Sequence, residues 1–587
     1  MGKGRVLKTY DSRTIFENLD TGNCLVITQI KEGWTSKDIQ VVERNQLSES
    51  SGQFLTLTIE AIFGFYDLLS GPYVAVVVES ENFLSTNGIE IRKALKIVVI
   101  PLFRNTRFLS ESKQKDEDKY LQLLQSGFNS HQFFFSNSYD ITSTQQRRAK
   151  YVLSKANDPL WARANPKFFW NKDIVQDLIA NNADDWIVPF MSAYIEFRPG
   201  CEIDNDKFSM LFISRRSRMR QGCRFTKRGI DENGYVANYV ETEQILLFPD
   251  GKITSFVQLR GSIPVIWSSP VHMKWDPTVF IEEDRVKSVE YCEKHINDIN
   301  TDCSDNTLTL NQICYVNLID GKKDQGKLAV EFKEVIELAQ QHTSIQLRYV
   351  WFDFHHETKQ KGKWNNLSKL VKIIDDSIQL HGFFCKLSSG EITSWQTGII
   401  RTNCMDNLDR TNVVQSIIAR RSLLMQLNRK DLLQSEKVLE IPFKKFEVIY
   451  KTIWANNANE MSNLYAGTGA LKVDFTKTGK RTIKGMIDDG INACMRYYIN
   501  NFTDGIKQDS IDLLLGTFKP DPLGPSPFQQ REGQETLSDN LNKGFVLLIL
   551  IFTCSLLISP TIYSNFIPNL TPKKLVLYQL LSSFSLT

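Results

Sequence analysis

Cys404 stands six residues before Arg410 in the segment Thr397–Asn412. A cysteine thiolate can attack phosphorus and form a covalent phosphocysteine intermediate, which water then hydrolyses. The planar guanidinium of an arginine can hold two oxygens of the same phosphate group. The two residues therefore predict hydrolysis of a phosphate ester, with Cys404 as the nucleophile and Arg410 as the phosphate clamp.

The residues on either side predict how this pair is positioned. A short apolar run that ends at Ile400 is typical of a strand, and the residues from Val413 to Met425 have apolar side chains at helical spacing. The cysteine and the arginine then lie on a loop that joins a strand to the N-terminus of a helix. Free backbone N–H groups and the helix dipole favour a bound phosphate there, and the same field stabilises a thiolate.

Two carboxylates lie in the same loop, Asp406 and Asp409. A loop that binds a phosphate dianion should avoid acidic residues, because like charges repel. A carboxyl group beside the phosphate would stay protonated and could donate its proton to the leaving alkoxide. Asp409, next to the clamp arginine, is the favoured acid. The alternative is that both carboxylates point away and accept backbone N–H groups. Thr411 either bonds the thiolate or serves only in the first turn of the helix.

Composition excludes several classes of protein. The chain has 587 residues, enough for two to four domains, with 42% apolar and 23% charged residues. Its 70 basic and 67 acidic residues leave a net charge of +3, which does not indicate a nucleic-acid partner. Ten cysteines include no pair or cluster with metal-ligand spacing, so neither a metal nor another cofactor is expected. The glycines near Gly469 and Lys480 do not have nucleotide-loop spacing, so no nucleotide is expected.

The sequence divides into four regions. Residues 1–184 are strand-rich, as in the apolar run Tyr73–Val78, and residues 185–516 mix strands with helices, which predicts an α+β or α/β fold. Residues 517–543 have the composition of a linker. Residues 544–563 carry no charge, which predicts a membrane-spanning helix at the end of a cytosolic protein. Residues 575–587 are too few for a clear second span.

The segment Arg401–Asn412 closely resembles the signature of the Sac-domain (suppressor-of-actin) phosphoinositide phosphatases. Further segments from about residue 60 to 515 resemble that family in the same order: Ile213–Ser217, Arg228–Asp231, Ala237–Gln244, Phe256–Gln258, Arg260–Pro264, Phe352–His355, Tyr465–Lys472, Thr478–Thr482, Arg496–Tyr498 and Gln508–Leu513.

The resemblance implies dephosphorylation of phosphatidylinositol monophosphates, chiefly the 4-phosphate and also the 3-phosphate. It implies a β-rich N-terminal Sac subdomain packed on a catalytic domain of the Cys-phosphatase type. With the apolar C-terminal segment, it implies residence in endoplasmic-reticulum and Golgi membranes, with the catalytic domain in the cytosol. The expected partners are phosphoinositide lipids, and no feature identifies a protein partner. One departure is Asn407, because the family usually has a second cysteine there; a protective role for that thiol cannot operate in this chain.

Other residues are candidates for supporting roles. Four remaining loop residues would shape the phosphate site: Asn403, Met405, Asn407 and Leu408. Asp353 and His355 are two apart on an expected strand, Ile345–His355, so they either support the loop from one face or form a structural hydrogen bond. Local basic residues would form a cationic face for lipid headgroups, or else surface charge and internal ion pairs: Arg215, Arg216, Lys227, Arg228, Arg260, Lys480 and Arg481.

Two further functions remain open from the sequence. A catalytically silent phosphoinositide-binding scaffold would keep the fold and the basic face without turnover. A protein-tyrosine phosphatase would use the same cysteine and arginine. The two loop carboxylates and the expected membrane segment disfavour the second alternative.

Overall fold

The structure is a computed structural model, and it describes most of the chain up to residue 528. The residues outside the description are 1–3, 31–36, 48–51, 87, 105–106, 155–156, 272–277, 304–309, 359–365, 430–432, 434–440, 472, 479–481 and 529–587.

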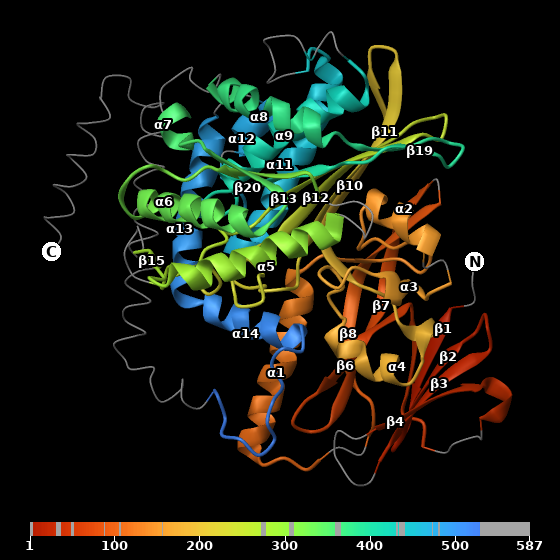
Figure 1. Ribbon diagram of the computed structural model, residues 1–587. Coiled ribbons are helices and arrows are strands. Elements are labelled where there is room, and N and C mark those ends of the chain that lie inside the picture. The colour runs from red at the N-terminus through yellow and green to blue at the C-terminus, as the bar shows by residue number, and fades with distance from the viewer. Residues whose placement is uncertain are drawn as a thin grey trace, which may run out of the picture.

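A five-stranded antiparallel sheet opens the chain, in the spatial order β4-β3-β2-β1-β5. Its strands are β1 (Arg5–Thr9), β2 (Arg13–Asn18), β3 (Asn23–Gln29), β4 (Lys37–Glu43) and β5 (Leu55–Ile59). Alternating apolar residues such as Leu7, Phe16 and Leu25 pack on Val74 and Val76 of the following sheet. The small sheet therefore covers one face of the next sheet (Figure 1).

A 13-stranded sheet forms the centre of the molecule (Figure 1). Its main path in spatial order is β17 (Gln346–Trp351), β16 (Gln312–Asn317), β20 (Gly398–Asn403), β13 (Ile253–Arg260), β12 (Val240–Leu247), β11 (Asp206–Arg216), β10 (Met191–Ile203), β9 (Phe133–Phe135), β8 (Ile89–Pro101), β7 (Pro72–Thr86) and β6 (Ala61–Asp67). Two short strands extend from β13, namely β18 (Phe384–Lys386) and β19 (Ile392–Ser394), and β14 (Trp267–Ser268) pairs separately with β15 (Phe280–Ile281).

The helices are α1 (Glu111–Ser130), α2 (Gln145–Ser154), α3 (Leu160–Arg163), α4 (Gln176–Ala180), α5 (Arg285–Cys303), α6 (Lys323–Ala339), α7 (Phe354–Thr358), α8 (Leu367–His381), α9 (Asp409–Gln426), α11 (Lys444–Ala466), α12 (Val473–Thr478), α13 (Ile483–Phe502) and α14 (Asp504–Leu514). Short 3-10 turns are η1 (Arg44–Gln46), η2 (Asp173–Val175), η3 (Asp184–Trp186) and η4 (Gln340–His342).

Helices cover both faces of the sheet at its β12–β17 end. On one face, α5 and α6 bury apolar residues such as Ile296 and Phe332 against Tyr315 of β16. On the other face, α8 and α9 bury apolar residues such as Ile374 and Ile418. Because helices cover both faces here, β16 is buried along its whole length. Strands buried on both faces are rich in apolar residues, as most of β16 is.

The strands β13, β20, β16 and β17 run parallel, so their carboxyl ends meet at one edge of the sheet. The loops that leave this edge follow Asn403, Asn317 and Trp351. In α/β sheets, ligand sites form where such loops gather. The fold therefore brings the Cys404 loop beside the loop that begins at Leu318, although the two are far apart in sequence.

The sequence-based expectations hold in part. The mixed α/β fold with a large mixed sheet is confirmed, and so is the strand-rich beginning of the chain. The large sheet continues through both predicted domains, and the division at residue 184 stays a prediction. The expected strand Ile345–His355 is corrected, because β17 ends at Trp351 and His355 lies on α7.

The C-terminal expectations fall mostly outside the described residues. These are residues 529–543 of the predicted linker, the span 544–563 and the second stretch 575–587. Among the helices that the structure describes, none is long and apolar enough to cross a bilayer.

Replacing Gly398 with alanine should destabilise the protein. A Cβ at this position of β20 would meet the buried ring of His381, whose Nε2 lies 3.1 Å from Gln312 Oε1. Overpacking of this kind costs about 1–3 kcal/mol, measurable as a lower midpoint in urea denaturation. Gly505→Ala is the control, because its added Cβ meets no atom within 4 Å outside the adjacent backbone of its own helix. Equal stability of Gly398→Ala and wild type would contradict the close packing of β20 on α8.

Candidate active site

Cys404 begins a loop between β20 and α9, as the sequence predicts. The thiol is buried, with 2% of the residue exposed, and α9 begins five residues later at Asp409. Asn407 has a left-handed backbone with φ of 56°, and its side-chain amide donates to the Asn238 carbonyl at 3.1 Å. Asparagine tolerates this conformation better than most residues, so the loop reverses here without glycine.

Asp406 is held by two arginines from a distant segment. Arg224 donates to both carboxylate oxygens, at 2.9 and 2.6 Å, and Arg228 donates to Oδ1 at 2.8 Å. Arg228 also donates to the Met405 carbonyl at 2.8 Å. Burial would raise the pKa of Asp406, but the two guanidinium charges hold that pKa well below its usual range. Asp406 is therefore an ionised carboxylate that fixes the loop to the 224–228 segment.

Asp409 has a different environment. Its Oδ1 accepts the backbone N–H of Leu471 at 3.0 Å, and its Oδ2 lies 4.0 Å from Nη1 of Arg496. Arg496 is buried and also donates to the Thr468 hydroxyl at 3.1 Å and the Gly469 carbonyl at 3.1 Å. The 468–471 segment thus lies directly against the first turn of α9, which matches the expected alternative that this carboxylate accepts a backbone N–H.

Arg410 is oriented by a carboxylate that the sequence did not single out. Its Nη1 donates to the Leu318 carbonyl at 3.3 Å and to Asp320 Oδ1 at 3.2 Å. His355 Nδ1 lies 2.9 Å from both oxygens of Asp320. Burial raises the pKa of Asp320, but the His355 hydrogen bond and the Arg410 charge bring it below its ordinary value. His355 therefore supports the clamp through Asp320.

Asp353 supports the same region through the backbone. Its Oδ2 accepts the N–H of Gly321 at 2.8 Å, and its Oδ1 accepts the N–H of His356 at 3.0 Å. The first bond ties the chain after β17 to the chain after β16. The second bond satisfies an N–H group in the first turn of α7. Asp353 thus has a structural role beside the clamp.

The remaining loop residues are anchored to the protein interior. Asn403 donates to Asn317 Oδ1 at 2.7 Å, which joins the ends of β20 and β16. Leu408 is buried and packs with Tyr465. The hydroxyl of Thr411 is buried and has no hydrogen-bond partner among the described residues. The loop is thus held at both ends and along its length.

Comparisons with known proteins match this architecture. Residues 60–359 match the family described as the SacI homology domain. The chain is 37% identical over 468 residues to "Phosphatidylinositol-3-phosphatase SAC1-A" of Danio rerio, which covers 80% of this chain and 77% of that protein. It is 35% identical over 501 residues to "Phosphoinositide phosphatase SAC6" of Arabidopsis thaliana, covering 85% and 81%. It is also 34% identical over 491 residues to "Phosphatidylinositol-3-phosphatase SAC1" of Saccharomyces cerevisiae, covering 81% and 75%.

The chain belongs to the SacI homology domain family. The sequence resemblance is therefore confirmed.

The expected cationic face is corrected for several residues of this Sac-family chain. Arg215 is fully buried and pairs with Glu241 at 3.0 Å and Glu243 at 2.6 Å, so it is an internal ion pair. Arg216 and Arg260 are also buried, because they lie on central strands covered by helices. Lys480 and Arg481 lie outside the described residues.

Sequence reasoning missed four contributors to the Sac-family site: Arg224, Asp320, Tyr465 and Arg496. The hydroxyl of Tyr465 donates to the carbonyls of Arg224 and Lys227 at 3.3 and 3.2 Å, and so positions the segment that holds Asp406. The signal for Asp320 was its place just after an apolar strand, like Cys404. Tyr465 and Arg496 begin two of the segments that resemble the family, and spacing alone does not reveal Arg224.

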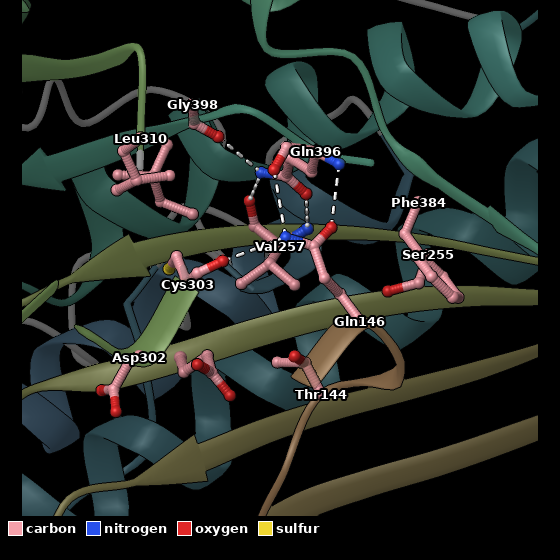
Figure 2. Close-up of a pocket in the computed structure, with 12 residues that line it drawn as sticks. Thr144, Gln146, Ser255, Val257, Asp302, Cys303, Leu310, Phe384, Gln396 and Gly398 are labelled. Carbon is pink, nitrogen blue, oxygen red and sulfur yellow. Dashed lines mark hydrogen bonds between the residues drawn. The ribbon is translucent and has the colours of Figure 1, made fainter. Parts of the chain in front are cut away.

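A small internal pocket lies at a different place (Figure 2). The Gln146 side chain donates to the Gln396 carbonyl and accepts the Gln396 backbone N–H, and the Gln396 side chain bonds the backbone of Val257 in the same way. Its volume of about 20 Å³ suits a single water molecule. No residue of the Cys404 loop lines it. Within the described parts of the chain, no group of three or more His, Cys, Asp or Glu side chains is arranged to hold a metal ion.

Replacing Asp406 with asparagine should lower the free energy of unfolding by about 3 kcal/mol at pH 7, because two arginines lose their partner. The folded pKa of Asp406 is depressed, so its stabilisation is present above the unfolded pKa of about 3.9 and is lost below it. The difference between the variant and wild type should therefore be constant from pH 7 to 5 and shrink below about pH 4.

Urea denaturation at several pH values measures this difference. Asp376→Asn is the matched control, because Asp376 pairs with Arg348 at 2.5 Å but its side chain is 73% exposed. An exposed pair contributes less than about 1 kcal/mol. A loss of stability in Asp406→Asn no larger than in this control would show that the ion pairs with Arg224 and Arg228 do not hold the loop.

Proposed function

We propose that the chain is a phosphoinositide phosphatase that hydrolyses phosphatidylinositol monophosphates, chiefly the 4-phosphate and also the 3-phosphate. The observation that carries this proposal is the Cys404 loop, which places a thiol, a clamp arginine and a helix N-terminus together in a Sac-family chain. The names of the relatives support the substrate class, because they are phosphoinositide and phosphatidylinositol-3-phosphatases.

The reaction proceeds in two steps at Cys404. The thiolate attacks the phosphorus atom, an S–P bond forms and the P–O bond to the inositol ring breaks. Water then attacks the phosphocysteine, which releases inorganic phosphate and restores the thiolate. Arg410, held in place by Asp320, binds the phosphoryl oxygens in both steps. The loop N–H groups stabilise the charge that develops on those oxygens.

The leaving inositol oxygen needs a proton, and Asp409 is the proposed donor. Asp406 suits this role poorly, because two arginines keep it ionised. The Asp409 side chain is 28% exposed at the start of α9, adjacent to Arg410 in the sequence. After the first step, the same carboxylate can take the proton from the attacking water.

The proposed place of action is the cytosolic face of endoplasmic-reticulum and Golgi membranes. The uncharged segment 544–563 supports this, because a tail anchor would confine the enzyme to the surface that holds its substrate.

Replacing Cys404 with serine should abolish phosphate release from vesicles that contain phosphatidylinositol 4-phosphate, with EDTA present. The hydroxyl is a far weaker nucleophile than the thiolate, so a loss of at least about 1,000-fold is expected. Phosphatidylinositol 3-phosphate should be hydrolysed more slowly by wild type. Cys385→Ser is the control and should retain full activity, because Cys385 lies on β18, outside the loop that carries Cys404 and Arg410. A folded wild type that binds the lipid without turnover would instead support the silent scaffold.

Replacing Asp409 with asparagine should slow lipid hydrolysis about 100- to 10,000-fold, the usual contribution of a general acid. With p-nitrophenyl phosphate the loss should be less than about tenfold, because this leaving group needs no proton. Asp406→Asn is the comparison and should slow both substrates alike, since it fixes the loop. An equal loss of Asp409→Asn on both substrates would contradict the proton-donor role.

A further inference from the structure

Helix α13 carries its apolar side chains on the outside of the protein. They follow one another at intervals that place them on one face of the helix: Ile483, Met486, Ile487, Ile491 and Met495. All of them except Ile487 are between 42% and 54% exposed. The side that α13 buries is instead formed by Gly485, Arg496 and Asn500. A surface helix normally turns its apolar face to the core, so α13 has the opposite orientation.

Polar contacts fix this orientation. The guanidinium of Arg496 donates to the hydroxyl of Ser462 on α11 at 3.0 Å. The helix begins at a firm cap, because the hydroxyl of Thr482 accepts the N–H of Gly485 at 2.9 Å. A Cβ on Gly485 would collide with the carboxylate of Asp474, so the first turn of α13 lies tightly against α12. The outward apolar face is therefore a property of the fold, and such exposed patches mark interaction sites.

The inner side of α13 contacts the first turn of α9. Nη1 of Arg496 lies 4.0 Å from Oδ2 of Asp409. A cleft of about 410 Å³ lies between α12 and α13, and its lining includes Ile491 and Ala470. The next residue, Leu471, donates its N–H to Asp409. The cleft thus joins the border of the apolar face to the segment that holds the proposed proton donor.

A lipid bilayer fits this face better than a protein partner. The most exposed apolar side chains of α13 are isoleucines and methionines, whereas tryptophan, tyrosine and arginine dominate protein interfaces. Helices that lie in a membrane surface bury such an apolar face and keep lysines beside it. Lys484 is exposed on α13, and Lys477 is exposed in the last turn of α12. Asp488 is exposed on α13 as well, so apolar contact and not net charge would hold the helix.

We propose that the outer face of α13 docks on the surface of a phospholipid bilayer. The proposal rests on the proposed function, because a phosphatidylinositol monophosphate keeps its acyl chains in the bilayer while its headgroup enters the site. A bilayer against α13 lies about 10–12 Å, the diameter of one helix with its side chains, from the start of α9. This face takes the place of the expected cationic face, whose arginines at positions 215, 216 and 260 are buried.

Photolabelling from the bilayer tests this contact without substrate. The full chain is bound to vesicles of phosphatidylcholine and phosphatidylserine that include a phosphatidylcholine with a diazirine on its acyl chain. Bound chains are recovered by flotation, irradiated and digested with trypsin. The α13 peptide 485–496 follows Lys484 and ends at Arg496. It should carry at least about fivefold more label per bound chain than the α8 peptide 373–386, because its apolar side chains enter the bilayer.

The α8 peptide is the matched control. Its residues Ile373 and Leu380 are 46% and 51% exposed, as much as the apolar residues of α13. The carbonyl of Leu380 accepts the Thr397 hydroxyl at 3.1 Å, one residue before β20 begins at Gly398. The end of α8 therefore lies at the edge of the sheet opposite to Cys404.

A pair of variants tests the side chains themselves. Replacing Ile491 and Met495 together with glutamine should lower the label on peptide 485–496 at least about fivefold. The ratio of phosphate release from vesicles to release from a soluble short-chain phosphatidylinositol 4-phosphate should fall with it. Replacing Ile373 and Leu380 together with glutamine is the control and should leave both values at the wild-type level. Both pairs replace exposed residues, so both should unfold at the wild-type temperature.

Several outcomes would overturn the proposal. One is a full chain that does not float with the vesicles, and another is equal label on the two wild-type peptides. A cross-link from the Lys484 amine to a second copy or to residues 529–587, with no lipid label on α13, would assign the face to that occupant instead. If the α13 pair does not fold, the comparison of the two wild-type peptides decides. A chain that releases no phosphate but is labelled on α13 would refute the phosphatase activity and leave the docking surface intact.

Discussion

In the proposed reaction the loop that begins at Cys404 must hold negative charge, yet it contains two carboxylates of its own. Every other feature of the site depends on how these carboxylates are neutralised. Asp406 is paired with Arg224 and Arg228, and Asp409 lies near Arg496. Without these cations the loop would repel both a thiolate and a phosphate. With them, each carboxylate becomes a point of attachment that fixes the loop.

These attachments explain why so much of the chain is needed to form one loop. The Arg224–Asp406 contact joins residues 182 positions apart, and the segment with Arg224 is held in turn by Tyr465. The clamp arginine is oriented by Asp320, 90 positions earlier. The parallel strands β20 and β16 bring the Cys404 loop and the Asp320 loop to one edge of the sheet, and the 224–228 segment, α11 and α13 supply the other contacts. The geometry of the site is thus a property of the whole fold.

Local features of the site could be predicted from the sequence, because they depend on short spacing. The strand, loop and helix around Cys404 follow from the apolar pattern on both sides, and the structure has them there. The end of β17 could not be read from composition. Its apolar pattern runs on to Phe354, and the strand stops at Trp351 because Asp353 bonds the N–H groups of Gly321 and His356. Such a stop depends on a residue from another loop.

The charge of the arginine side chains was the least reliable basis for predicting whether they are exposed or buried. Arginines usually lie on surfaces, so the sequence favoured a cationic face for Arg215, Arg216 and Arg260. All three lie at the ends of largely apolar strands, β11 and β13, and all three are buried. The partners of Arg215, Glu241 and Glu243, lie on a strand that only the sheet register identifies. The sheet register decides whether a buried arginine is paired. The spacing of residues along the sequence does not reveal that register.

Asn407 shows how the loop can lose a family feature and keep its shape. The family usually has a cysteine at this position, where the backbone of this chain is left-handed, with φ of 56°. Asparagine adopts that conformation readily, and its amide also bonds the carbonyl of Asn238. Both effects stabilise this turn of the loop. The loop has no second thiol, so no disulfide inside it can protect Cys404 from oxidation. The replacement therefore changes the redox chemistry of the loop and preserves its geometry.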